Sequence, residues 1–281
     1  MERAWFSAHR SKISAEANGV TSRILIGHDG PDREPQLPLA GMTKERQRLA
    51  AAFRACEPLL VLGPQGCGKT RLITELLRSD GRVQYIAWQP SLHGLLVSMA
   101  RRLIAIGHPE FLGRVQLPRQ YADVEKWVAT QTSVHLKGLL WNAMERAPIP
   151  MMLDGIAGSG FPTYRFLQRI YHIPGMALFA ASRDPLRLGA LARLFWDPSR
   201  TLNIQPLSER DAAQLFHAAV DHFRLGDLDM DQFGEKVLES ARGNPGQIIE
   251  MCRLAMQPKY ISGRSVKFAP LRIDTVIKFG G

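Results

Sequence analysis

Short apolar runs alternate with amphipathic stretches through the first two-thirds of the chain. Continuous apolar runs are typical of parallel strands buried on both faces, and they predict strands at 59–62, 83–88, 149–153, 176–181 and 201–204. Helical spacing between these runs predicts helices at 43–53, 69–77, 91–106, 124–145, 163–172 and 186–195, the fourth with room for one break. This alternation indicates an α/β fold, with a parallel sheet flanked by helices.

The pattern changes after Pro206. Three helical patterns, 208–223, 230–241 and 247–256, follow with no strand pattern between them. Ser208, with Asp211 three residues later, predicts an N-terminal cap for the first of these helices. We therefore expect four parts, which are an N-terminal arm at 1–38, an α/β domain at 39–205, a smaller all-helical lid at 206–258 and a basic C-terminal tail at 259–281.

The first predicted strand leads into a glycine-rich segment. From Gly63 to Thr70 the chain reads GPQGCGKT, which fits the phosphate-loop motif G-x-x-x-x-G-K-[ST], and an amphipathic helix follows. Glycines let backbone N–H groups point at phosphates, and the helix N-terminus adds unpaired N–H groups of its own. We therefore expect a nucleoside triphosphate, ATP with Mg²⁺, to contact Gly63, Pro64, Gln65, Gly66, Cys67, Gly68, Lys69, Thr70 and Arg71.

Three residues of this loop carry separate expectations. Lys69 is expected to reach the β and γ phosphates as a point charge. The hydroxyl of Thr70 is expected to ligate Mg²⁺. Cys67 allows two interpretations: a reactive thiol that controls nucleotide binding, or a small side chain that simply fits, and we favour the second.

A later apolar strand delivers a carboxylate. Asp154 follows the predicted strand 149–153, at the sheet edge where open α/β folds bind their ligands, so we expect it to hold Mg²⁺ directly or through water. Many ATPases of this layout carry a glutamate next, which orients the attacking water. Here that position is Gly155, and residues 156–160 offer no acid. The sequence thus predicts metal binding with slow or partner-dependent hydrolysis.

Several further segments appear in a consistent order along residues 40–257. They read GMTKER at 41–46, LFAASRD at 178–184, QPLS at 205–208 and GNPG at 243–246. With the phosphate loop and the Asp154 strand, they resemble the AAA+/STAND group of P-loop ATPases, especially its NB-ARC and origin-recognition-like domains. Met42 in place of the usual arginine and Gly155 in place of the second acid depart from that pattern.

The resemblance implies roles for two more residues. Arg183 would sense the γ-phosphate and would join Lys69 and Asp154 as the catalytic set, although an arginine there also suits a simple pair with Asp184. Pro245 would contact the base or ribose of the nucleotide, although a proline that starts a helix needs no such function. Together these roles imply an ATP-dependent switch in which the lid responds to the nucleotide.

The chain is basic, and its charge suggests a second function. The formal net charge is +10, and the cations are densest from Arg242 onward. Such a surplus favours phosphate contacts with duplex DNA, so the alternative is an ATP-dependent DNA-binding accessory factor, a helper in transposition or replication. A basic protein without that partner explains the charge equally well. A small-molecule kinase is disfavoured, because the three lid-like helices follow the sheet region.

Location and partners follow from weaker signals. No apolar run approaches the ~18 residues of a membrane span, the first residues lack an apolar signal core, and three cysteines form neither a disulfide framework nor a zinc spacing. We therefore expect a cytoplasmic protein without a membrane partner. The expected partners are ATP or ADP, with duplex DNA, a homo-oligomer or another protein left open.

Overall fold

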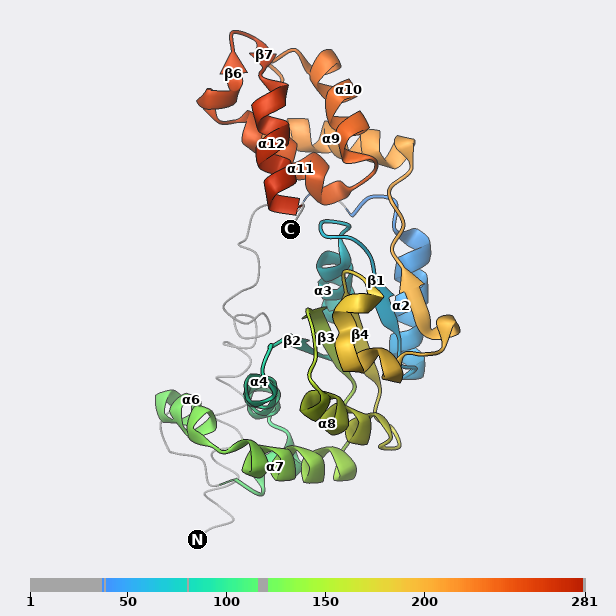
Figure 1. Cartoon of the computed structure of the whole chain (residues 1–281), viewed down its shortest axis with the longest axis vertical. Coiled ribbons are helices and arrows are strands. Elements are labelled where there is room, and N and C mark those ends of the chain that lie inside the picture. The colour runs from blue at the N-terminus through green and yellow to red at the C-terminus, as the bar shows by residue number, and fades with distance from the viewer. Residues whose placement is uncertain (1–36, 38, 80, 116–120, 280–281) are drawn as a thin grey trace.

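A five-stranded parallel sheet forms the centre of the α/β part of the protein (Figure 1). The computed structural model describes residues 37, 39–79, 81–115 and 121–279, so the predicted arm at 1–38 lies, apart from Leu37, outside the described residues. The strand order is β2-β3-β4-β1-β5, with β1 Leu60–Leu62, β2 Gln84–Ala87, β3 Met151–Ile156, β4 Leu178–Ser182 and β5 Thr201–Asn203. The predicted parallel sheet and its five strands are confirmed.

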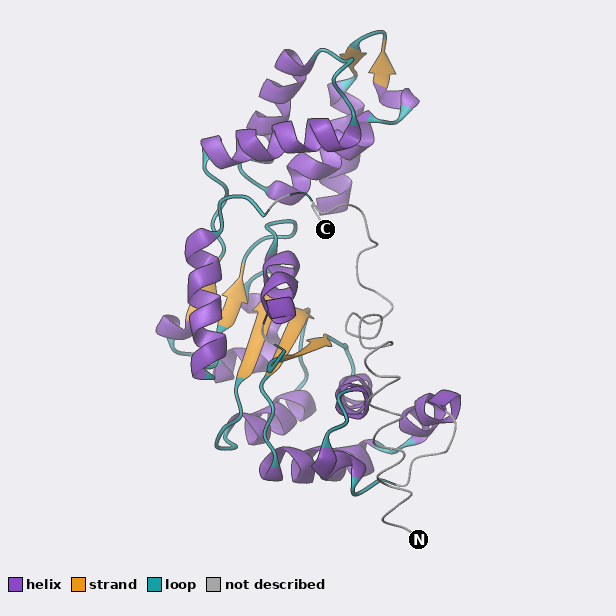
Figure 2. Ribbon diagram, turned by 180° about the vertical axis from the view of Figure 1, so that it is seen from behind, coloured by secondary structure: helices purple, strands orange, loops and turns teal. Residues whose placement is uncertain are grey.

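Helices cover both faces of this sheet, as Figure 2 shows from behind. Their bounds are α2 Thr43–Ala55, α3 Lys69–Ser79, α4 Leu92–Ala105, α5 Pro109–Leu112, α6 Tyr121–Thr130, α7 Ser133–Arg146 and α8 Phe161–Tyr171, with 3-10 segments η1 Pro185–Leu194 and η2 Pro198–Arg200. Successive residues of β1 point to opposite faces: Val61 packs in the core that contains α2 and α3, while Leu60 and Leu62 pack in the core that contains α4, α7 and α8. Burial on both sides explains the continuous apolar runs.

A helical lid follows the sheet and lies beyond its phosphate-loop edge (Figure 1). It comprises α9 Glu209–Phe223, α10 Met230–Ala241, α11 Pro245–Ala255, η3 Pro258–Tyr260, β6 Ile261–Ser262, β7 Ser265–Val266 and α12 Phe268–Phe279. Ser208 caps α9, since its hydroxyl accepts a hydrogen bond from the Asp211 N–H at 3.2 Å, as the sequence predicts. The apolar core of the lid is continuous with the core under α2 and α3.

The predicted helix at 124–145 has the single break that the sequence allowed, because Thr132 caps α7 by accepting from the His135 N–H. Local structure departs from the hydrophobic pattern at two other places. The predicted helix at 186–195 is instead the 3-10 segment η1, interrupted at Gly189, whose φ of 56° breaks the helical path. Residues 259–281, set apart as a basic tail by composition, contain a small hairpin and α12, and α12 packs on α10 and α11.

Candidate functional site

The phosphate-loop motif forms the turn between β1 and α3. Gly66 and Gly68 take φ angles of 81° and 95°, in the left-handed region that favours glycine. Helix α3 begins at Lys69, so the N–H groups of its first turn open onto the loop. The segment therefore has the strand–loop–helix setting that a phosphate cradle requires.

The ammonium group of Lys69 lies inside the loop. Its Nζ donates hydrogen bonds to the carbonyl oxygens of Gly63 at 2.6 Å and Pro64 at 2.9 Å, and lies 3.6 Å from the Cys67 sulfur. Any phosphate that reaches Lys69 must replace these backbone contacts. The Cys67 side chain is buried, and a Cβ atom on Gly63 would lie 2.7 Å from its sulfur, so the thiol fills the interior of the loop.

Three elements meet at the side chain of Asp154 in β3. Its Oδ2 accepts a hydrogen bond from the Thr70 hydroxyl at 2.7 Å and another from the Tyr85 hydroxyl at 3.1 Å. The structure thus brings together the two residues that the sequence analysis assigns to the metal, Thr70 and Asp154. Burial, followed by the nearby charge of Asp154, raises the pKa of Tyr85 well above its ordinary value, so this phenol remains a donor at neutral pH.

The residues after the neighbouring parallel strands β3 and β4 lie at the same edge of the sheet. Gly155 takes a φ of 80° and a Cβ atom added there would meet nothing within 4 Å, so the position that lacks the second acid is open. Arg183 directly follows β4, and Ser182 before it donates to the Ile156 carbonyl oxygen at 2.8 Å, which ties β4 to β3.

Asp184, which the sequence offers as a simple ion-pair partner for Arg183, caps η1. Asp184 accepts from the Arg187 N–H at 3.1 Å at the start of η1, and its carboxylate lies 3.7 Å from the Arg187 guanidinium. Arg71 lies in the first turn of α3, where burial lowers the pKa of its guanidinium and the charge of Glu75 opposes that shift. Arg71 is therefore a partly buried residue in the first turn of α3, directly after the phosphate loop.

The lid touches the phosphate loop through the start of α11. The Gly246 N–H donates to the Gly66 carbonyl oxygen at 2.9 Å, and Nδ2 of Asn244 donates to the Gln65 carbonyl oxygen at 2.9 Å. The approach is close, because a Cβ atom on Gly246 would lie 2.7 Å from Cα of Gly66. First-turn N–H groups of a helix have no partner in their own helix, and the loop supplies one here.

The last turn of α12 makes a second contact with the same loop. Nε2 of Gln65 donates to the Lys278 carbonyl oxygen at 3.2 Å, and a Cβ atom on Gly66 would lie 2.6 Å from the Phe279 ring. Two helices of the lid therefore meet the phosphate loop side by side.

The lead-in before α2 closes the other side of the loop. A Cβ atom on Gly68 would lie 2.8 Å from the Met42 methyl group and 4.0 Å from Cγ of Pro245. Met42, the departure from the family pattern, is thus a buried apolar contact of the loop. A Cβ atom on Gly41 would lie 2.8 Å from the Asp211 carboxylate, which places the lead-in against α9. The lead-in and the lid segments, far apart in sequence, converge on this loop.

Sequence reasoning missed several residues of this site. Tyr85 gave no signal beyond its place in a predicted strand, since no motif marks a residue that reaches a neighbouring strand's carboxylate. Phe279 lay in a segment without an assigned element. Asn244 and Gly246 stood in the quoted GNPG turn, whose polar side chain before a proline predicts a helix cap but not its contact with the loop.

Two wider findings concern the residues that the structure describes. No group of three or more His, Cys, Asp or Glu side chains among them is arranged to hold a metal ion by itself. Within the same ranges, no helix combines the length and the apolarity needed to cross a lipid bilayer.

A parallel sheet with a phosphate loop between β1 and the following helix α3 defines the P-loop class of folds. Comparison with protein-family models gave no match, and neither did comparison with curated proteins. Among solved structures, a Walker-type ATPase from Pyrococcus abyssi superposes with a TM-score of 0.54 at 12% identity, over 90% of this chain and 75% of that one.

Two other solved structures align less closely. A STAND protein with a tetratricopeptide repeat sensor from Pyrococcus horikoshii has a TM-score of 0.47 at 14% identity, over 89% of this chain but 34% of that longer one. A point mutant of RuvB from Thermotoga maritima has a TM-score of 0.48 at 14% identity, over 86% and 71%. The likeness to the Walker-type ATPase, with the strand order and the loop, confirms the expected α/β fold of a P-loop NTPase.

Proposed function

We propose that this protein binds ATP with Mg²⁺ and acts as a nucleotide-dependent switch. One observation carries the proposal: the lid donates two hydrogen bonds, from Gly246 and Asn244, directly to the phosphate loop. A ligand bound in that loop changes the surface on which the lid rests, and a ligand shifts a conformational equilibrium only when it contacts the two states differently. The contacts between lid and loop support the proposal, because a ligand in the loop would lie beside the lid atoms that make them.

The residues present fit the magnesium ion that this fold class implies. Thr70 and Asp154 bring a hydroxyl and a carboxylate oxygen within 2.7 Å of each other beside the loop, and oxygen ligands of this kind suit Mg²⁺. When bound, the ion would neutralise phosphate charge. Tyr85 would orient the Asp154 carboxylate from the neighbouring strand β2.

The other site residues take roles at the same edge of the sheet. Lys69 would bind the β and γ phosphates, and the backbone N–H groups of Gly63–Thr70 would surround them. Arg183 would reach the γ-phosphate from the end of β4, while Arg71 lies in the first turn of the loop helix. Pro245, at the start of α11 and near Gly68, would lie against the nucleoside.

We infer that hydrolysis is slow or needs a partner. The position after Asp154 is Gly155, so the acid that would orient the attacking water is absent there. The positive φ of Gly155 would strain any side chain placed at this position. A second copy or another protein would then supply the missing group. We also propose a cytoplasmic location. The three cysteines Cys56, Cys67 and Cys252 are all unpaired, as is usual in a reducing compartment.

The test measures ATP affinity and ATP turnover on one sample. A fluorescent ATP analogue is titrated into the wild type and into Lys69→Ala, with Mg²⁺ and with EDTA. We expect saturable binding by the wild type, a loss of at least roughly 100-fold in Lys69→Ala because two phosphate contacts disappear, and turnover well below about 1 per minute. Unchanged affinity in Lys69→Ala would sink the assignment.

A second function, assembly on duplex DNA, is favoured by the net charge of +10. In this hypothesis the protein is an accessory factor that assembles on DNA when ATP is bound. Duplex DNA is titrated with ATP present at two salt concentrations, and phosphate contacts predict affinity that falls steeply with salt. Affinity for DNA that does not change with salt would argue against phosphate contacts. Turnover that rises several-fold with DNA would favour the accessory-factor hypothesis.

A further inference from the structure

Helix α12 presents an unpartnered apolar face. Ile273, Val276 and Ile277 are 60%, 54% and 72% exposed, and their spacing places them on one side of the helix. Leu271 and Thr275 on the opposite side are buried in the lid. Exposed aliphatic side chains gathered in this way mark interaction surfaces, whereas single ones do not.

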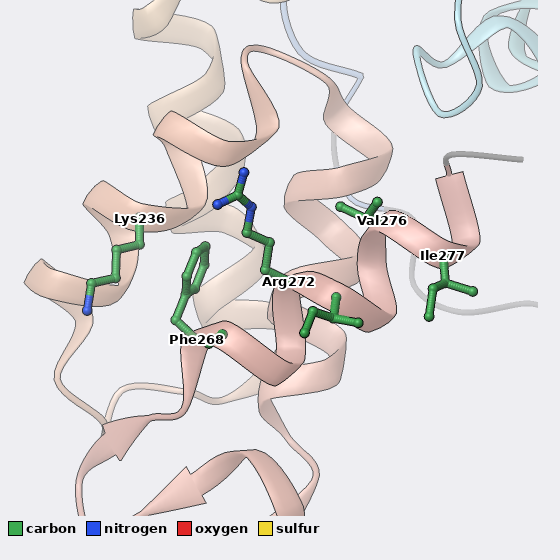
Figure 3. A pocket seen from close by; sticks show the side chains of 7 residues that line it. Lys236, Phe268, Arg272, Val276 and Ile277 are labelled. Carbon is green, nitrogen blue, oxygen red and sulfur yellow. The ribbon is translucent and has the colours of Figure 1, made fainter.

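This face borders a groove between α10 and α12 (Figure 3). The groove is shallow and open to solvent, with a volume of about 700 Å³, and is lined by Lys236, Phe268, Ala269, Arg272, Ile273, Val276 and Ile277. Both charged side chains in this lining are cations. A smaller polar pocket of about 310 Å³ adjoins it, where Arg242 adds a third cation and Glu239 a single carboxylate.

We propose that this groove binds an amphipathic helix of a partner protein, whose apolar face is bordered by carboxylates. An apolar groove accepts the apolar face of a helix, and Lys236 and Arg272 at its walls would pair with the acidic border. A second copy of this chain fits less well, because a symmetric contact would bring the same cations together. Nucleic acid needs the cations but has no use for three exposed aliphatic side chains.

The position of the groove links it to the phosphate loop. Ile277 is followed directly by Lys278 and Phe279, which contact Gln65 and Gly66 of the loop. A helix seated on α12 would therefore touch the element whose last turn meets the nucleotide site. This link rests on the proposed switch, whereas binding to the groove does not depend on it.

The experiment uses two labelled peptides and the full chain without nucleotide. Both peptides are amphipathic helices of about 16 residues with leucines on one face, bordered by glutamates in the first and by lysines in the second. Fluorescence anisotropy should show binding of the acidic peptide and at least roughly tenfold weaker binding of the basic one. Ile277→Glu should weaken the acidic peptide by roughly tenfold or more, and Arg272→Glu should also weaken it.

Val134→Glu is the matched control, because Val134 on α7 is 80% exposed and lies outside the groove. Its peptide affinity should equal that of the wild type, and thermal melts should show that all variants are folded. Equal binding of both peptides, or no effect of Ile277→Glu, overturns the proposal. If Ile277→Glu abolishes self-association, the occupant of the groove is a second copy and the proposal is overturned. If it abolishes salt-dependent DNA binding, the occupant is DNA and the proposal is likewise overturned. Lys69→Ala should bind the acidic peptide as the wild type does. The peptide result is therefore independent of whether the protein binds nucleotide.

Discussion

At the scale of single residues, one carboxylate oxygen connects three elements. Oδ2 of Asp154 on β3 accepts from Thr70 on α3 and from Tyr85 on β2. Asp154 is 6% exposed, so an unpaired oxygen there would be costly and two donors satisfy it. Because Tyr85 stays protonated, its hydroxyl holds the carboxylate in one orientation, as outer residues of metal sites do.

We predict that Tyr85→Phe weakens the affinity for the Mg²⁺ that supports nucleotide binding. Loss of one hydrogen bond to a charged carboxylate corresponds to about 1.5–3 kcal/mol, or roughly 10- to 150-fold in affinity. The Mg²⁺ concentration at half-maximal binding of a fluorescent ATP analogue should rise by that factor, with little change in affinity measured in EDTA.

The control for this variant is Tyr171→Phe. Tyr171 on α8 accepts a hydrogen bond from Arg200 at 2.8 Å, so it loses a comparable contact outside the loop. Its Mg²⁺ midpoint should match the wild type. Equal midpoints in all three proteins would show that Tyr85 does not position Asp154.

At the scale of elements, buried charge fastens α12 to the lid. Glu250 on α11 is 7% exposed and receives hydrogen bonds from Arg253 at 2.6 Å and Lys278 at 2.8 Å. Burial raises the pKa of Glu250, but the hydrogen bonds from both cations outweigh it and hold the pKa below its ordinary value. In the middle of α12, Asp274 accepts from Tyr260 and Lys259. Together these bonds fix the helix that reaches the loop.

We predict that Glu250→Gln destabilises the protein at neutral pH and much less in acid. A lowered pKa in the folded state gives stability that is present above the unfolded-state pKa of about 4.3 and is lost as pH falls through the folded value. Urea unfolding should show a loss of about 1–3 kcal/mol at pH 7 that shrinks below about pH 4.

Glu239→Gln provides the comparison for that measurement. Glu239 is exposed on α10 of the same lid, so its replacement should change stability by less than about 0.5 kcal/mol at either pH. A loss in Glu250→Gln that stays constant from pH 7 to pH 3.5 would show that the carboxylate charge is not what stabilises α12.

At the scale of the whole molecule, the lid meets the α/β part at the phosphate loop, at the lead-in and along a shared apolar core. The chain passes from the sheet into the lid between β5 and α9 (Figure 1). A continuous apolar core runs from α2 and α3 into the lid, which gives the lid a defined seat. A ligand that binds in the phosphate loop would therefore lie at the contact between the lid and the α/β part.

We predict that ATP with Mg²⁺ changes hydrogen exchange in the lid as well as in the loop. The Gly246 N–H is bonded to the Gly66 carbonyl oxygen, so its exchange reports directly on that contact. Peptides covering 244–247 and 277–279 should change several-fold on nucleotide binding, while peptides from 133–146 on α7 should not. Changes confined to 63–70 would mean that the lid does not respond to the nucleotide.

Much of this architecture was predictable because its signals are local. The strands at 59–62 and 149–153 are apolar runs, and the phosphate loop is a contiguous motif whose glycines at 66 and 68 have the positive φ it requires. The 3-10 geometry of η1 was not predictable from spacing, because Gly189 turns the chain where a Cβ atom would lie 2.8 Å from the Ser159 carbonyl oxygen. Helix α12 escaped notice because its exposed face is apolar, which obscures amphipathic periodicity.

The sequence by itself determined the phosphate loop, the strand that ends in Asp154 and the absence of an acid at Gly155, since each depends on residue type and spacing along a short stretch. The tertiary structure alone decided that Tyr85 bonds to Asp154, and that Asn244, Gly246 and Phe279 meet the loop. These contacts join residues far apart in the chain, and only the packing of strands and helices around a common core brings such residues within bonding distance.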